Sequence, residues 1–168
     1  MRSVDEEFKS RGAFMRFLTL TFLVLLGFSV SQAQAHCQIP CGIYDDARQF
    51  KELKEHVTTI EKSMREINEL SALDKPDIHK ITRWTINKEE HAQKIQDIIS
   101  SYFLTQRVKL PKEDTNQQNY VDHVTKLHAI LVAAMKTKQK LDLSTIDVLN
   151  KAITDYENHY FKKHGHKH

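Results

Sequence analysis

Four stretches of the chain repeat apolar residues every three or four positions, and this periodicity constrains the fold more than any other feature. At that spacing the apolar side chains share one face of an α-helix, and that face is buried against other helices. The clearest stripe consists of Phe50, Leu53, Val57, Ile60, Met64, Ile67 and Leu70. Helices are therefore expected at about residues 45–70, 78–104, 118–138 and 144–163.

The segments between these stripes carry residues that end or begin helices. Pro76 disfavours helix in the residue before it and so ends the first helix. Residues 107–119 are mostly polar and predict a loop. Ser144 is a typical N-cap for the fourth helix, and Asp46 places a negative charge where the first helix begins.

The other stripes supply the rest of the expected core, and no stretch predicts a strand. In the second helix the stripe consists of Ile81, Trp84, Ile95, Ile98, Ile99, Tyr102 and Phe103. In the third it consists of Val121, Val124, Leu127, Leu131, Ala134 and Met135. In the fourth it consists of Ile146, Leu149, Ala152, Ile153, Tyr156 and Tyr160. These patterns predict an all-α fold, an antiparallel up-down four-helix bundle over residues 45–163.

The N-terminus has the pattern of a secretory signal peptide. An uncharged apolar run at residues 17–30 follows several basic residues and precedes Ala33 and Ala35, which have the spacing of a cleavage site. The run is short for a membrane span, although a retained anchor and a start at Met15 are alternatives. We expect residues 1–35 to be removed, to contact only the export machinery, and to direct the protein to the periplasm, the exterior or an organelle lumen.

The charge balance argues against a nucleic-acid partner. The net charge is +3, from 25 basic and 22 acidic residues, and it is too small for a polyanion-binding protein. The histidine-rich tail at residues 164–168 is either a solvated basic end or a loose metal-binding segment. His56 and His79 have no evident partners, and His123 and His128 do not share a helix face.

The only two cysteines, Cys37 and Cys41, lie directly behind the expected cleavage site. A disulfide between them would close a very small loop and stabilise the fold little. A structural zinc site would need a second pair of ligands, and the motif for covalent haem is absent. Cleavage after Ala35, in contrast, would give His36 a free amine beside two thiolates.

These donors suit a different metal. The amine and imidazole of His36, the amide nitrogen and thiolate of Cys37 and the thiolate of Cys41 form a compact nitrogen and sulfur set, which favours nickel(II) or copper(II). Nickel is preferred because copper tends to oxidise thiolates. Pro40 fixes φ and Gly42 permits a tight backbone turn, so this segment can form a hook.

The stretch HCQIPCGIY at residues 36–44 resembles the N-terminal nickel hook of the nickel-containing superoxide dismutases. The resemblance, which extends over the helices to residue 163, implies conversion of superoxide to dioxygen and hydrogen peroxide by a nickel ion that alternates between Ni(II) and Ni(III). It implies that His36 provides the amine and an axial imidazole, Cys37 an amide nitrogen and a thiolate, and Cys41 the second thiolate. Tyr44 matches the tyrosine that guards the small-anion site.

The resemblance also implies supporting residues and an assembly. Glu52 matches the carboxylate that orients the His36 imidazole, with the neighbouring charged residues of the first helix as alternatives. His91 stands where the family has a supporting arginine, which is a departure from the pattern. The family assembles as a homohexamer, to which exposed aromatic residues such as Tyr102 and Phe103 would contribute.

Two rival functions remain compatible with the sequence. One is an exported, non-catalytic helical bundle in which Cys37 and Cys41 form a disulfide or store metal. The other keeps the hook but uses it only as a nickel carrier. Free thiols and superoxide turnover distinguish the enzyme from both.

Overall fold

The structure, a computed structural model, describes residues 46–111 and 117–164. The chain divides into two units, Met1–His36 and Cys37–His168, and all described residues belong to the second. The predictions for residues 1–45 and 165–168 therefore lie outside the described residues. The helices are α2 (Asp46–Ser71), α3 (Ile78–Asp97), α4 (Gln117–Gln139) and α5 (Ser144–His164), and α3 continues as the π-helix η1 (Ile98–Arg107).

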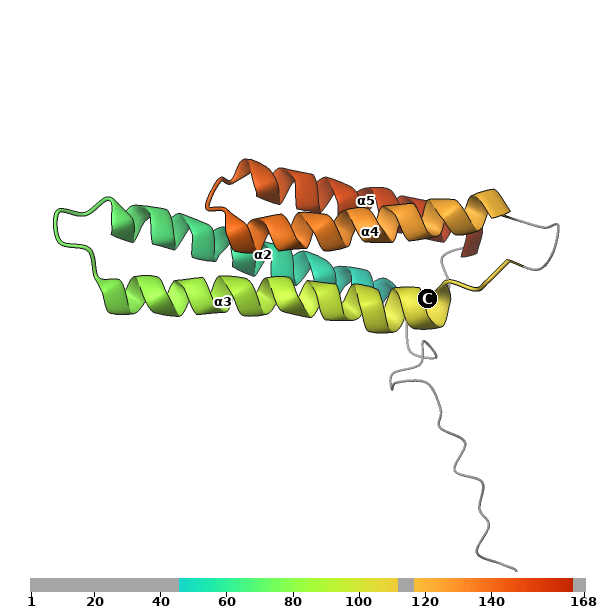
Figure 1. The fold of residues 1–168 in the computed structure, drawn as a ribbon, viewed down its shortest axis with the longest axis horizontal. Coiled ribbons are helices and arrows are strands. Elements are labelled where there is room, and N and C mark those ends of the chain that lie inside the picture. The colour runs from blue at the N-terminus through green and yellow to red at the C-terminus, as the bar shows by residue number, and fades with distance from the viewer. Residues whose placement is uncertain (1–45, 112–116, 165–168) are drawn as a thin grey trace, which may run out of the picture. The chain divides into compact units, whose positions relative to one another are not determined.

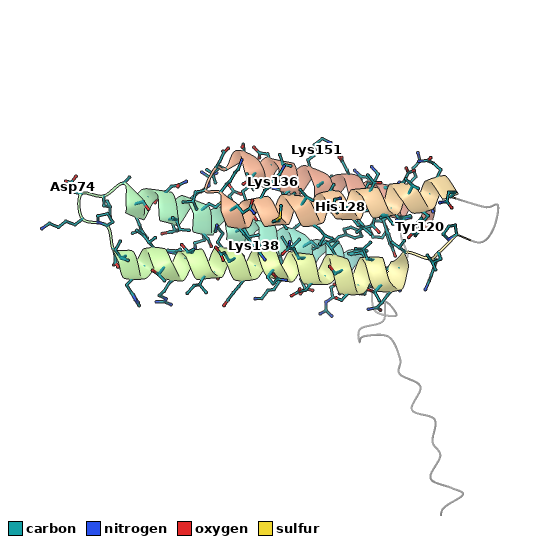
Figure 2. The ribbon with its side chains drawn as sticks, viewed as in Figure 1. Asp74, Tyr120, His128, Lys136, Lys138 and Lys151 are labelled. Carbon is teal, nitrogen blue, oxygen red and sulfur yellow. The ribbon has the colours of Figure 1, made fainter. Side chains whose placement is uncertain are left out.

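The described residues form an antiparallel four-helix bundle, as predicted. Successive helices run in opposite directions, and α2 and α3 form one hairpin while α4 and α5 form the other (Figure 1). Each helix packs against its neighbours in the order α2, α3, α4, α5 and back to α2. Polar side chains such as Asp74, His128 and Lys151 lie on the outer surface (Figure 2). Within the part described, no strand is present and no helix has the length and apolar character needed to cross a membrane.

Most of the predicted core is confirmed, but the stripe on α4 is displaced. Its buried residues are His123, Leu127, Ile130, Ala133, Ala134 and Thr137. Val121 and Met135, predicted as core, are 43% and 40% exposed. The sequence pattern was misleading because the buried stripe begins and ends on polar residues that find partners inside the bundle. The His123 ring lies 3.3 Å from the Tyr156 hydroxyl, and the Thr137 hydroxyl donates to the Ala134 carbonyl at 2.7 Å.

An aromatic cluster joins α2, η1 and α5. The Phe50 ring lies 4.8 Å from Phe103, 5.9 Å from Tyr156 and 5.7 Å from Tyr160, measured between centroids. Tilted contacts at these distances are favourable beyond the area they bury. Phe103 is fully buried and Tyr102 is 5% exposed, so the expectation that these two residues are exposed at a subunit interface is wrong.

The second helix changes its winding at Ile98. The predicted α-helix ends at Asp97, and the wider turns of η1 follow, closed by a hydrogen bond from the Val108 amide to the Phe103 carbonyl at 3.0 Å. Side chains support the wide turns, because Thr105 Oγ1 donates to the Ser100 carbonyl five residues earlier. A π-helix rotates the residues that follow it and is often found at functional sites.

The connection between α4 and α5 also differs in detail from the sequence prediction. Ser144 is the first residue of α5, and its hydroxyl donates to Asp142 Oδ2 at 2.7 Å. The Asp142 carboxylate also accepts the Ser144 amide at 2.9 Å. At the C-terminal end of α4, the buried Lys88 amine of α3 donates to the Thr137 carbonyl at 3.0 Å. This cation satisfies the negative end of the helix dipole.

The aromatic cluster predicts a large cost for removing its central ring. Phe50→Ala should lower the free energy of unfolding by about 3–5 kcal/mol, because it leaves a cavity among rings from three elements. Denaturant unfolding would measure this, with Leu110→Ala, at a side chain that is 80% exposed, as the control. A similar small change in both variants would contradict the central role of Phe50.

Candidate metal centre

The residues of the predicted hook lie outside the described part of the chain. These are His36, Cys37, Pro40, Cys41, Gly42 and Tyr44. Their roles stay predictions, and the chemistry of their donors fits nickel, since two thiolates and nitrogen ligands suit a borderline-soft metal. The first described residue, Asp46, follows Tyr44 by two positions and begins α2. The contacts of Asp46 therefore fix the start of the helix that follows the hook motif in the sequence.

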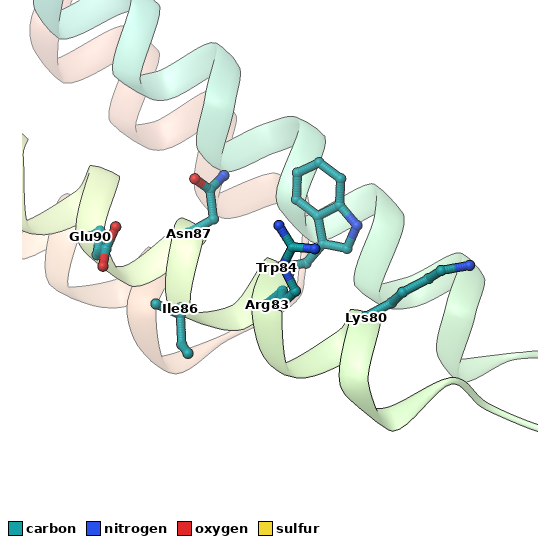
Figure 3. A pocket seen from close by; sticks show the side chains of 6 residues that line it. All are labelled: Lys80, Arg83, Trp84, Ile86, Asn87 and Glu90. Carbon is teal, nitrogen blue, oxygen red and sulfur yellow. The ribbon is translucent and has the colours of Figure 1, made fainter.

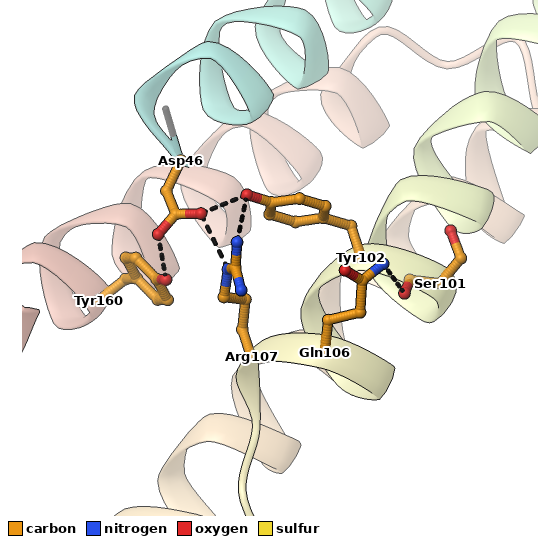
Figure 4. A network of polar contacts seen from close by, with 6 residues as sticks. All are labelled: Asp46, Ser101, Tyr102, Gln106, Arg107 and Tyr160. Carbon is orange, nitrogen blue, oxygen red and sulfur yellow. Dashed lines mark hydrogen bonds and ion pairs between the residues drawn. The ribbon is translucent and has the colours of Figure 1, made fainter. Parts of the chain in front are cut away.

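Asp46 is held by three donors from two other elements (Figure 4). The Tyr102 hydroxyl of η1 donates to Asp46 Oδ1, and Arg107 Nε donates to the same oxygen at 2.9 Å. The Tyr160 hydroxyl of α5 donates to Asp46 Oδ2 at 2.6 Å. Arg107 Nη2 also donates to the Tyr102 hydroxyl at 2.9 Å, which closes the network.

The charges of this network reinforce one another. Burial alone would raise the pKa of Asp46, but hydrogen bonds from Tyr102, Tyr160 and Arg107 and the charge of Arg107 lower it overall. Burial and the nearby carboxylate raise the pKa of Tyr102 to about 12. The same two causes raise the pKa of Tyr160. At neutral pH the carboxylate is therefore charged and both phenols keep the protons they donate.

Next to this network, Gln106 presents a buried acceptor. Its amide nitrogen donates to the Ser101 carbonyl at 3.1 Å (Figure 4). Its Oε1 is buried and has no hydrogen-bond partner in the described structure. A buried acceptor of this kind is costly unless it is satisfied. It lies in the same turn of η1 as Arg107.

A second polar cluster connects α2 and α3 and contains both predicted supporting residues. His91 Nδ1 lies 3.0 Å from His56 Nδ1, and the two rings pack edge to face. On the other side of the His56 ring, Nε2 lies 3.9 Å from Glu52 Oε1. The structure thus brings Glu52 and His91 into one cluster through His56. The prediction that His56 has no partner is wrong.

Both histidines of this cluster favour the neutral form. Burial lowers the pKa of His56, and the charge of Lys94 lowers it further, against the opposing effect of Glu52 and Glu55. Burial, Lys94 and His56 likewise lower the pKa of His91. Because desolvation is the largest cause in each ring, the pair is uncharged at neutral pH.

The rest of the bundle offers no competing metal site in the region described. Within residues 46–111 and 117–164, no three His, Cys, Asp or Glu side chains are grouped so that they could hold a metal ion. An open pocket of about 600 Å³ lies on α3 and is lined by Lys80, Arg83, Trp84, Ile86, Asn87 and Glu90 (Figure 3). Its lining is a mixture of apolar and oppositely charged side chains from one helix, without a cluster of acid, base or nucleophile.

Sequence reasoning missed the Asp46 network and His56. It treated Asp46 as a helix-start charge and assigned Tyr102 and Tyr160 to the apolar stripes. A pattern that counts tyrosine as apolar does not predict the hydrogen bonds of its hydroxyl group. The one available signal was the position of Asp46 directly after the hook motif, where a helix start needs an anchor.

The Asp46 network gives a pH-dependent prediction. Asp46→Asn should lower the free energy of unfolding by about 1–3 kcal/mol at neutral pH, because three donors lose their charged acceptor. The folded-state pKa of Asp46 lies below the unfolded value of 3.8, so its contribution is complete above that pH and is lost as the pH falls through the folded pKa. Unfolding curves at several pH values would show the two proteins converging in acid.

The matched control for this change is Asp155→Asn. Asp155 pairs with Lys151 at 2.6 Å on the exposed face of α5, where an ion pair contributes little. Equal losses in the two variants at neutral pH would show that the Asp46 network does not stabilise the start of α2.

Comparison with known proteins identifies the family. A family model described as nickel-containing superoxide dismutase matches residues 31–164, which include the hook motif and all four helices. No curated protein and no solved structure matches the chain. Because the match covers most of the chain, the protein belongs to the family of nickel-containing superoxide dismutases and is a nickel-dependent oxidoreductase whose substrate is superoxide.

Proposed function

We propose that this enzyme disproportionates superoxide at a nickel centre that forms only after residues 1–35 are removed. Bound at the hook, nickel would supply one-electron redox chemistry between Ni(II) and Ni(III), by which two superoxide anions and two protons would give dioxygen and hydrogen peroxide. The observation that carries the proposal is the family match over residues 31–164, which includes the complete donor set.

Each donor of the hook has a separate task in this proposal. The thiolates of Cys37 and Cys41 donate electron density and make the higher oxidation state accessible. His36 binds through its terminal amine and its imidazole, which requires the peptide bond to Ala35 to be cut. Tyr44 shields the position that a small anion occupies, and Pro40 and Gly42 shape the turn.

The bundle supports the hook at two places on α2. Asp46 fixes the point where the hook joins the bundle, through contacts with η1 and α5. Glu52 follows six residues later, about 9 Å along the helix. We assign its carboxylate to the imidazole of His36, because a hydrogen bond to a ligand histidine fixes its ring and raises its basicity.

Export and assembly are part of the same proposal. The apolar run at residues 17–30, with Ala33 and Ala35 behind it, would deliver the chain to the secretory pathway and then release the amine of His36. A homohexamer would bury apolar residues that the described bundle leaves on its surface. These include Ile78 at 67%, Val148 at 54% and Ile86 at 53% exposure.

The first test concerns the free amine. Nickel-loaded protein that begins at His36 should dismutate superoxide, whereas the same protein with Ala35 retained should not, because the backbone nitrogen of His36 is then a peptide amide and not an amine. A rapid-mixing superoxide assay with nickel quantification would measure both. Equal turnover would show that the terminal amine is not a ligand, and nickel binding without turnover in the His36 form would favour the carrier.

The second test concerns the thiolates. Cys37→Ser and Cys41→Ser should each reduce turnover to the level of free nickel ion, because each removes a ligand. Gln38→Ala is the matched control, since it changes the hook without removing a donor. A fully active Cys41→Ser protein would contradict the hook assignment, and a disulfide detected in the active preparation would favour the non-catalytic bundle.

A further inference from the structure

We propose that His56 and His91 are positioning residues for Glu52, in which a hydrogen bond from His91 to His56 places a protonated His56 Nε2 toward the Glu52 carboxylate, and that this pair carries no more than one positive charge. The inference rests on the proposed function only where Glu52 is said to support His36. The arrangement of the two rings follows from the contacts between α2 and α3. No local sequence pattern indicates it, because His56 and His91 are 35 positions apart.

The contact between the two rings fixes the roles of their nitrogens. His56 Nδ1 and His91 Nδ1 are 3.0 Å apart, which is a hydrogen-bond distance. A neutral imidazole has one nitrogen that donates and one that accepts. One Nδ1 must therefore carry a proton while the other accepts it.

Glu52 decides between the two possible arrangements. If His56 donated from Nδ1, its neutral ring would present a bare Nε2 to the carboxylate, 3.9 Å away. If His91 donates, the proton of His56 is on Nε2 and faces Glu52. The second arrangement replaces a repulsion with an attraction, so His91 Nδ1–H donates to His56 Nδ1. His56 Nε2–H then faces the Glu52 carboxylate across 3.9 Å, which is an electrostatic contact and not a hydrogen bond.

The same geometry limits the charge of the pair. One added proton enters at His91 Nε2 while the shared proton moves from His91 Nδ1 to His56 Nδ1, which converts His56 to a cation that donates toward both neighbours. A second proton would place hydrogens on both facing Nδ1 atoms and break the contact. Among the described residues, the charges acting on the pair are Glu52 and Glu55 on α2, and Glu90 and Lys94 on α3.

A metal ion is a poorer explanation of this cluster. The two facing Nδ1 atoms would be its ligands, but Glu52 lies beside Nε2 on the far side of the His56 ring. Lys94 places a positive charge near both rings. In the part of the chain that the structure describes, no third ligand completes a site.

A neutral histidine pair can restrain the Glu52 carboxylate without neutralising its charge, as a permanent cation would. A neutral donor restrains the carboxylate without cancelling its charge, so the full negative charge remains available to the imidazole of His36. A proton added to His56 reduces that charge. We therefore expect turnover to fall as the pH drops below the usual histidine pKa of 6.5, with His56 as the group responsible.

The decisive measurement is the tautomer of each ring in the unaltered protein. The full chain starting at His36, loaded with nickel in the divalent state and labelled with nitrogen-15 in histidine, would be examined by NMR. We expect His91 protonated on Nδ1 and His56 on Nε2, with resonances assigned from the single variants. Two rings that are both protonated on Nε2 and titrate independently would overturn the proposal.

Variants then test the consequence for the metal centre. His56→Gln should retain nickel but lower kcat/KM by about tenfold, the usual scale for a group that orients a ligand. It should also change the nitrogen hyperfine pattern of the oxidised centre and remove the acid fall in turnover. His128→Gln, on the exposed face of α4, is the matched control.

Substitutions of His91 separate positioning from packing. His91→Gln keeps a neutral donor toward His56 Nδ1 and should retain most of the turnover, whereas His91→Ala should lower it as His56→Gln does. If His56→Gln matched the His128→Gln control in turnover, pH profile and hyperfine pattern, the proposal would be wrong. Absence of turnover in the unaltered protein would instead refute the proposed function, while the tautomer result would still decide which ring donates to the other.

Discussion

The functional arrangement depends on the hydrogen bonds that the Asp46 carboxylate accepts. Asp46 is the first residue of α2, and the donors come from η1 and α5, which are distant in sequence. Three charge-assisted or phenolic hydrogen bonds on one partly buried carboxylate make its position well determined. Since the hook motif ends at Tyr44, the Asp46 side chain anchors the start of the helix that follows the motif two residues later.

The π-helix is what allows that network to form. Its wide turns bring Tyr102 and Arg107 to the same carboxylate, while Phe103 enters the aromatic cluster with Phe50. The polar anchor and the apolar cluster therefore share one irregular segment. This arrangement places the least regular part of the bundle next to the residues that join the hook, a common position for π-helical turns.

The predictable parts of the structure depend on residues that are close together in the sequence, whereas the unpredictable parts depend on contacts between residues that are far apart. Helix positions followed from apolar repeats and from Pro76, which act locally, and the hook followed from donors within a few residues of each other. The Asp46 contacts join residues 56, 61 and 114 positions apart, and no local pattern encodes such pairs. The same limit explains why His123 and Thr137 were not recognised as core, and why the partner of His56 emerged only when α2 and α3 were placed side by side.

The hydrophobic core of the described bundle is formed by residues that follow the hook, from Phe50 to Tyr160. We therefore expect the helices to fold before nickel is bound, unlike small domains whose folding energy comes from the bound ion. A cell short of nickel would accumulate a folded but inactive protein rather than an unfolded one. The amount of polypeptide would then be a poor guide to antioxidant capacity, and the supply of the ion would act as the control point.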